Sequence, residues 1–148
     1  MKNVIVAAAV VAFAALSAPL FAQGTASAPD ASVYIANIDD GAIVHSPVKV
    51  IFALSGMGVA PAGTEKANTG HHHLLIDRPA FGHGEDGAEE LIYGIPSDEN
   101  HIHFGGGQTE TTIDLAPGTH TLQMVLGDLG HVPHDKPVLS EVITVTVK

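Results

Sequence analysis

The sequence predicts an all-β fold, an antiparallel two-sheet sandwich of immunoglobulin-like or cupredoxin-like type. Short segments rich in Val, Ile, Thr and Leu recur along the chain, and Gly, Pro, Asp and Ser separate them. After residue 22 no segment combines helical periodicity with capping residues. Many short strands divided by turns are typical of β-sandwiches. The predicted strands are Val33–Ile38, Val48–Leu54, His72–Ile76, Thr111–Leu115, Thr119–Leu126 and Glu141–Val147.

The first 22 residues have the composition of a secretory signal peptide. Lys2 precedes an uncharged apolar run, Val4–Leu16, and Ala22 is a small residue at a suitable cleavage point. The run is shorter than the roughly 20 residues that a membrane-spanning helix needs. We therefore expect a signal peptide at residues 1–22, a periplasmic or secreted location, and no membrane insertion after cleavage.

The remaining chain has the length of one domain. Residues 23–32 are rich in Ala, Gly, Ser and Pro and are expected to form a flexible leader, and residues 33–148 a single β-sandwich domain. All 16 acidic residues but only five of the six Lys and Arg follow Ala22, which gives the exported chain a formal charge of −11. Such a surface repels phosphate backbones, so we expect no nucleic-acid partner, and it favours the approach of cations.

The chain has no cysteine, and this excludes several kinds of site. Blue-copper centres need a Cys thiolate, and Cys-ligated zinc, iron–sulfur clusters and thiol redox catalysis fail for the same reason. Disulfides are also excluded, so the core and any bound ligand must supply the stability of the domain.

Ten histidines, most of them clustered, indicate metal binding, because imidazole is the commonest protein ligand for zinc, copper and nickel. His101 and His103 are two positions apart in an extended segment, so both rings point the same way with Cα atoms about 6.5 to 7 Å apart. His131 and His134 follow a turn that contains Asp128, which is expected to act as a carboxylate ligand or to orient a histidine ring. The candidate metal ligands are His72, His73, His101, His103, His120, His131 and His134.

Strand alternation limits how these rings can be combined. If residues 71–77 are extended, His72 shares a face with Leu74 and Ile76, while His71 and His73 share the opposite face. At most two rings of the triple histidine can then bind the same ion. We expect His72 or His73 to converge with His103, His120 and His131 at one end of the sandwich.

The histidines and methionines also allow other interpretations. The histidine clusters are also compatible with a buried polar network or with a pH-responsive surface. His45 and His83 are isolated and are expected to be ordinary surface residues. Met57 and Met124 offer thioether ligands for Cu(I), although Met124 lies between Leu122 and Leu126 and fits a core position better.

Four blocks of the sequence resemble a family of small exported bacterial proteins described only as domain of unknown function 4399. The resemblance covers roughly Met57 to Val147 and implies a compact periplasmic β-domain without a settled activity. The blocks are Gly70–Asp77, His103–Glu110, Pro117–Leu122 and Gly127–Asp135, the last without Leu129 and Gly130.

Motifs of common enzymes are missing from the chain. It has neither a Gly-x-Ser-x-Gly nucleophile elbow nor a His-Glu-x-x-His metallopeptidase motif, and a resemblance of His101–Phe104 to superoxide dismutases spans only a few residues.

We expect a periplasmic metal-binding protein that acts as a carrier, scavenger or buffer, with a copper ion favoured over zinc. Protonation should release the ion between about pH 7 and pH 5. The alternative is a non-metal interaction module that binds an envelope partner and has a structural histidine network.

Overall fold

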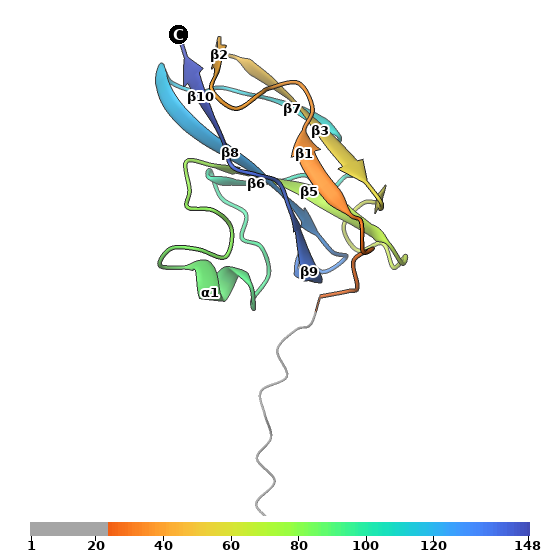
Figure 1. Cartoon of the computed structure of the whole chain (residues 1–148). Coiled ribbons are helices and arrows are strands. Elements are labelled where there is room, and N and C mark those ends of the chain that lie inside the picture. Colours follow the sequence, from red (N-terminus) through yellow and green to blue (C-terminus); the bar gives the residue numbers. More distant parts are fainter. Residues whose placement is uncertain (1–23) are drawn as a thin grey trace, which may run out of the picture.

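The computed structural model describes residues 24–148, and the predicted signal peptide lies outside them. These residues form two β-sheets packed face to face, which confirms the predicted all-β sandwich (Figure 1). The smaller sheet has the antiparallel order β1-β3-β7, where β1 is Ser32–Ile35, β3 is Val48–Ser55 and β7 is Glu110–Ile113.

The larger sheet contains the other seven strands. They are β2 (Ala42–Val44), β4 (Gly58–Val59), β5 (Thr69–Ile76), β6 (His101–His103), β8 (Gly118–Gly127), β9 (Pro133–Leu139) and β10 (Ile143–Val147). Strands β5 and β8 pair at its centre, β6 and β4 lie along the free side of β5, and β9 and β10 lie along the free side of β8. Pairing is antiparallel except between β2 and β10 and between β4 and β5.

The main core lies between the two sheets. Strand alternation places Leu74 on β5 and Leu122, Met124 and Leu126 on β8 toward Val50 and the other apolar residues of the smaller sheet. Met124 is fully buried there, as its core position predicts. The opposite face of the larger sheet is therefore the outer face of the sandwich.

All six predicted strands have counterparts, and β6 falls on the segment of His101 and His103 that was expected to be extended, but β2, β4 and β9 were not predicted as strands. Strands β2 and β4 are only three and two residues long, too short for a periodic signal. Strand β9 begins at Pro133 and contains Pro137, residues that argue against a strand from sequence. The structure accommodates both because β9 pairs on one side only among the described strands, with β8.

The segment between β5 and β6 departs most from expectation. The glycines and carboxylates of residues 78–100 predict an exposed acidic loop, but the segment contains the short helix α1 (Gly87–Glu90) and packs on the outer face of the larger sheet. Phe81 and Ile95 anchor it there against Leu75 and Val125. A second, smaller core thus covers part of the outer face. Figure 1 shows the segment that carries α1 beside the larger sheet.

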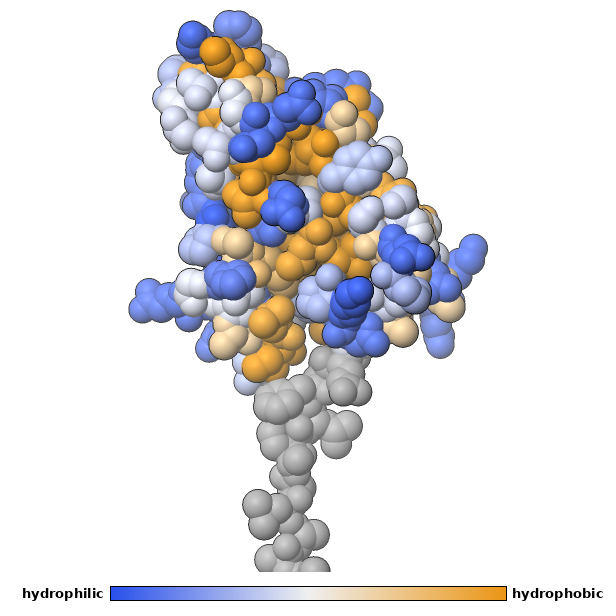
Figure 2. Space-filling model, viewed as in Figure 1, coloured by the Kyte–Doolittle hydropathy of each residue, from blue (hydrophilic) through white to orange (hydrophobic). Residues whose placement is uncertain are grey.

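The amino-terminal end of the described chain contacts the carboxyl-terminal half. In the segment expected to be a flexible leader, Thr25 donates its backbone N–H to Asp128 at 3.0 Å, and Ser27 donates to Asp135 at 3.1 Å. Within residues 24–148 no helix has the length and hydropathy to cross a membrane. Figure 2 shows hydrophobic residues interspersed with hydrophilic ones across the middle of one face.

Candidate metal centre

The triple histidine of β5 divides between the two faces of the larger sheet. His72 points toward the core, where its ring centroid lies 5.2 Å from that of Phe52 and its Nδ1 lies 3.1 Å from the carbonyl oxygen of Gln108. His71 and His73 point to the outer face, as the alternation of an extended strand requires. The prediction that no more than two of the three rings share one site agrees with this arrangement.

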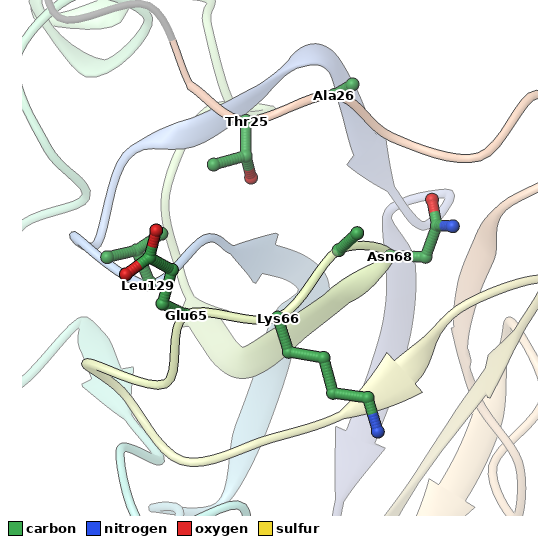
Figure 3. Close-up of a pocket in the computed structure, with 7 residues that line it drawn as sticks. Thr25, Ala26, Glu65, Lys66, Asn68 and Leu129 are labelled. Carbon is green, nitrogen blue, oxygen red and sulfur yellow. The ribbon is translucent and has the colours of Figure 1, made fainter.

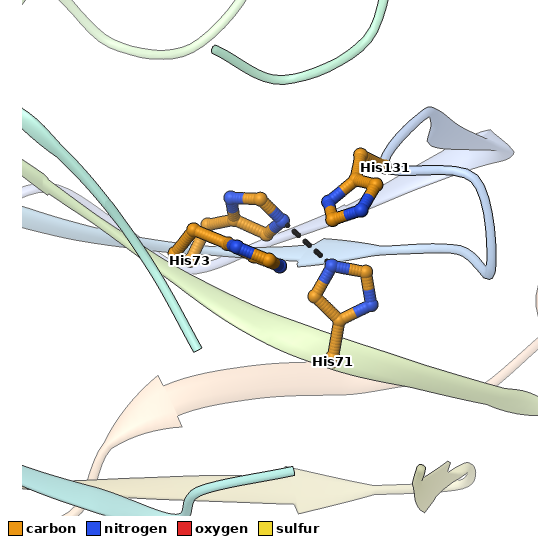
Figure 4. Close-up of side chains that lie close together, drawn as sticks. His71, His73 and His131 are labelled. Carbon is orange, nitrogen blue, oxygen red and sulfur yellow. Dashed lines mark hydrogen bonds between the residues drawn. The ribbon is translucent and has the colours of Figure 1, made fainter. Parts of the chain in front are cut away.

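Four imidazoles meet on the outer face: those of His71, His73, His103 and His131. One ring nitrogen from each lies within 4.8 Å of the corresponding nitrogens of the others. Antiparallel pairing sets His103 of β6 directly beside His73 of β5, and the ring centroids of His103 and His131 are 4.3 Å apart. The rings of His71, His73 and His131 point toward one another, with Nε2 of His71 and His73 separated by 3.0 Å (Figure 4). We call these four side chains the imidazole cluster.

Asp128 shapes the loop that carries His131. Its Oδ1 accepts the backbone N–H groups of Gly130 at 2.8 Å and Val132 at 3.1 Å, and its Oδ2 accepts that of Thr25. His131 itself has a φ of 62°, a left-handed conformation that costs energy for a residue with a side chain. Asp128 was predicted to be a ligand or a ring acceptor. Its hydrogen bonds within residues 24–148 instead fix the backbone from which the His131 ring projects.

Two glycines make room for the rings. A Cβ at Gly127, directly across from His71 in the β5–β8 pair, would lie 2.8 Å from Nε2 of His73. A Cβ at Gly105 would lie 2.4 Å from Cε1 of His103. Real Cβ atoms essentially never come within 3.0 Å of another heavy atom in this way, so both positions require glycine while the rings keep their places.

The cluster favours neutral imidazoles. Burial, followed by the proximity of His131 and His103, lowers the pKa of His71 to about 4. Burial, followed by the proximity of His71 and His103, lowers the pKa of His73 to about 2. The pKa of His103 is also lowered, by burial and by His131. Neutral imidazole is the form that coordinates a metal ion, so these rings hold that form at pH 7.

The cluster also has unused hydrogen-bonding capacity. Among residues 24–148, Nδ1 of His71, Nδ1 of His73 and Nε2 of His103 are buried without a hydrogen-bond partner. A buried polar group left unpaired costs about 1–3 kcal/mol. Four converging ring nitrogens, with three buried ring nitrogens of the same side chains left unpaired, fit a divalent transition-metal ion better than a self-contained polar network, which would pair them.

Three of the seven predicted ligands lie in the cluster: His73, His103 and His131. His71 completes it but was left out of the predicted set, although its position two residues before His73 on the same face was a usable signal. His72 lies on the core face instead. His134 lies on β9, and its Nδ1 is 3.1 Å from the hydroxyl oxygen of Thr25.

The remaining two predicted ligands make carboxylate contacts outside the cluster. Nε2 of His101 is 3.2 Å from Oε1 of Glu90, a residue of α1 that is only 5% exposed. His120 was expected to converge with the other rings, but its Nδ1 is 2.7 Å from Oδ2 of Asp77. His120 is seven residues from Gly127 along β8, about 23 Å at the usual rise of a strand, so its ring cannot reach the cluster.

A hollow of about 490 Å³ lies near the amino-terminal segment and is lined in part by Thr25, Glu65, Lys66 and Leu129 (Figure 3). None of the four cluster histidines lines it, and its two charges are of opposite sign. The metal-ligating chemistry of the described residues is therefore concentrated in the cluster rather than in this hollow.

Fold and site together define a small β-sandwich protein with a four-imidazole cluster on the outer face of its larger sheet. The chain belongs to the family described as Domain of unknown function (DUF4399), whose model matches residues 50–148. All four cluster histidines fall within the matched residues. Comparison with curated proteins and with solved structures gave no match.

Proposed function

We propose that this protein binds one transition-metal ion through His71, His73, His103 and His131, and serves as a carrier, scavenger or buffer. The observation that carries the proposal is the convergence of four imidazole nitrogens within 4.8 Å of one another. Isolated surface histidines do not converge in this way, and the four rings come from two strands and one loop that are distant in sequence.

The number of ligands favours binding over catalysis. Four imidazoles complete a tetrahedral or square coordination sphere, whereas catalytic zinc sites use three protein ligands and keep a position open for water or substrate. An ion held in this way exchanges only when a ring withdraws. That property suits storage and transfer of the ion.

Copper is the metal we favour, with zinc as the alternative. Nitrogen ligands bind Cu(II) more tightly than Zn(II) in the usual stability order of divalent ions. The 3.0 Å between Nε2 of His71 and His73 suits either metal. Ligand atoms about 2.0–2.1 Å from one ion lie about 2.9 Å apart at right angles and about 3.3 Å apart in a tetrahedron.

The periplasm is the compartment we propose, with residues 1–22 as a cleaved signal peptide. The composition of that segment supports export. A periplasmic protein without cysteine binds metal unaffected by the oxidising conditions there, since imidazole does not oxidise as a thiolate does.

Isothermal titration tests the proposal directly. The tag-free chain from Gln23 onward, treated with chelator and dialysed, is titrated with Cu(II) and separately with Zn(II) at pH 7.5. We expect one ion per chain, submicromolar affinity, and tighter binding of Cu(II). Affinity no better than millimolar for both ions would exclude the metal site and favour an envelope interaction module with a structural histidine network.

Thermal unfolding provides a second measurement on the same sample. A ligand that binds only the folded state stabilises it by about 2.7 kcal/mol at a free concentration one hundred times Kd. The melting temperature should therefore rise with added metal and return to its starting value with chelator. An interaction module would show no change at stoichiometric metal.

A further inference from the structure

Charged residues line a cleft of about 280 Å³ in the segment that covers the outer face of the larger sheet. The carboxylates of Asp86, Glu89, Glu90 and Asp98 line it together with the guanidinium of Arg78. Four carboxylates and one guanidinium leave three negative charges in the cleft. The guanidinium of Arg78 lies 3.2 Å from Glu90 and 3.5 Å from Asp86, so its positive charge pairs with these two carboxylates rather than with Glu89 or Asp98.

The cleft adjoins the imidazole cluster on one side through the backbone of the His131 loop. Gly94 lines the cleft, and a Cβ built on it would lie 3.3 Å from the carbonyl oxygen of His131. The next residue, Ile95, donates its backbone N–H to that same oxygen at 2.6 Å. The cleft wall and the loop that supplies a metal ligand are thus in direct contact.

His101 connects the cleft to the cluster on the other side. It is fully buried, it lies on the same face of β6 as His103, and its Nε2 is 3.2 Å from Glu90 in the cleft wall. Its Nδ1 has no hydrogen-bond partner within residues 24–148 and lies 3.6 Å from Oδ2 of Asp98. When Nε2–H donates to Glu90, Nδ1 presents a lone pair toward a carboxylate oxygen. That arrangement favours a cation between the two atoms.

We propose that the acidic cleft is the path by which a divalent transition-metal ion reaches the imidazole cluster, with His101 as an intermediate ligand between Asp98 and the cluster. This inference rests on the proposed function. Carboxylates in a cleft concentrate cations and raise association rates, but they hold a borderline ion more weakly than imidazoles do. The ion therefore moves inward by ligand exchange and loses bound water, with no change in its oxidation state.

The chain offers its own reporter for the test. It contains no Trp and only two Tyr, of which Tyr93 lines the cleft and is 65% exposed. In a Tyr34→Phe background, quenching of Tyr93 fluorescence by Cu(II) in a stopped-flow instrument reports arrival of the ion at this end of the molecule. Equilibrium Kd is measured on the same proteins by competition with a chelator.

Two double variants separate the cleft from overall charge. Asp86→Asn with Glu89→Gln removes two carboxylates that line the cleft. Glu85→Gln with Glu99→Gln removes two exposed carboxylates that are sequence neighbours of cleft residues but do not line it. Each pair changes the net charge equally, so a difference between them is a property of the cleft.

We expect the cleft variant to lower the association rate constant about five-fold at low salt, with Kd changed less than about two-fold, and the control to change the rate less than about two-fold. The difference should shrink at high salt because screening shortens electrostatic steering. His101→Gln should also slow association.

Two outcomes would overturn the proposal: equal association rates in both double variants, or an unchanged association rate with a weakened Kd in the cleft variant. An unchanged association rate in His101→Gln would overturn the path through His101. Absence of Cu(II) binding to the unsubstituted protein would instead overturn the proposed function itself.

Discussion

Nε2 of His71 and Nε2 of His73 lie 3.0 Å apart on the outer face of the larger sheet, while His72 between them packs against Phe52 on the opposite face. One strand thus gives neighbouring residues different roles. His71 and His73 contribute to the imidazole cluster, and His72 contributes to the core.

His131→Asn should lower the affinity for Cu(II) and Zn(II) at least about ten-fold while the domain stays folded. Asparagine tolerates the left-handed backbone that His131 adopts, so the substitution removes a ligand without new strain. Losing a metal ligand costs more than the 10- to 100-fold that is typical of residues supporting one. The check is isothermal titration beside His83→Gln, an exposed histidine whose loss should change nothing. Equal affinities for the two variants would remove His131 from the site.

Adjacent substitutions on β5 should have opposite signatures. His72→Leu should leave metal affinity within about two-fold of the original and lower the free energy of unfolding by about 1–2 kcal/mol, because the carbonyl of Gln108 loses its donor. His71→Leu should lower metal affinity at least ten-fold by the ligand argument above. Urea unfolding and metal titration of both proteins make the comparison. A loss of binding in His72→Leu with the fold intact would place that ring in the site and contradict the assignment of faces.

Much of this arrangement follows from sequence alone. The alternation of residues 71–77 assigns His71 and His73 to one face, and the apolar Leu74 and Ile76 beside His72 already indicate that its face is the core. The same signal would have replaced His72 with His71 in the predicted set.

Other parts require the strand pairing. His101 lies on the same face as His103, but its neighbour Glu90 arrives from the segment 77–100, whose path no periodic pattern predicts. The prediction that His120 converges with the other histidines assumed that its end of the strand lies at the same end of the sandwich as theirs. The register that pairs His71 with Gly127 places His120 at the far end of β8 instead.

Metal binding should persist to lower pH than binding by exposed histidines. Protons compete with the metal only once an imidazole is protonated, and burial lowers the pKa of His71 to about 4 and of His73 further still. The release expected from sequence between about pH 7 and pH 5 therefore shifts downward. Titrations at pH 7.5, 5.5 and 4.5 beside a hexahistidine peptide measure the shift. Identical midpoints for protein and peptide would show that burial does not protect the ligands.

The metal-free protein should lose stability in acid over a defined window. A histidine whose pKa is lower in the folded state binds more protons when unfolded, so stability falls as pH drops below about 6.5, the unfolded value. For His71 the loss continues to about pH 4, where the folded state also takes up the proton. Each pKa unit of difference corresponds to about 1.4 kcal/mol. Urea unfolding in chelator at pH 7.5, 5.5 and 4.5 tests this, and His71→Gln should show a shallower decline than the original protein.

Gly127→Ala should impair metal binding more than it impairs folding. The new Cβ would lie 2.8 Å from Nε2 of His73, so the ring must rotate away from His71 or the strand must shift.

The matched control is Gly41→Ala. Gly41 directly precedes β2 and has open space around its Cβ, and its φ of 80° makes any loss there a backbone effect alone. We expect at least a ten-fold weaker Cu(II) affinity in Gly127→Ala and an unchanged affinity in Gly41→Ala, measured by chelator competition, with circular dichroism to verify folding. If Gly127→Ala keeps full affinity, the ion does not occupy the space between His73 and β8, and the site must use the outer edge of the cluster at His103 and His131.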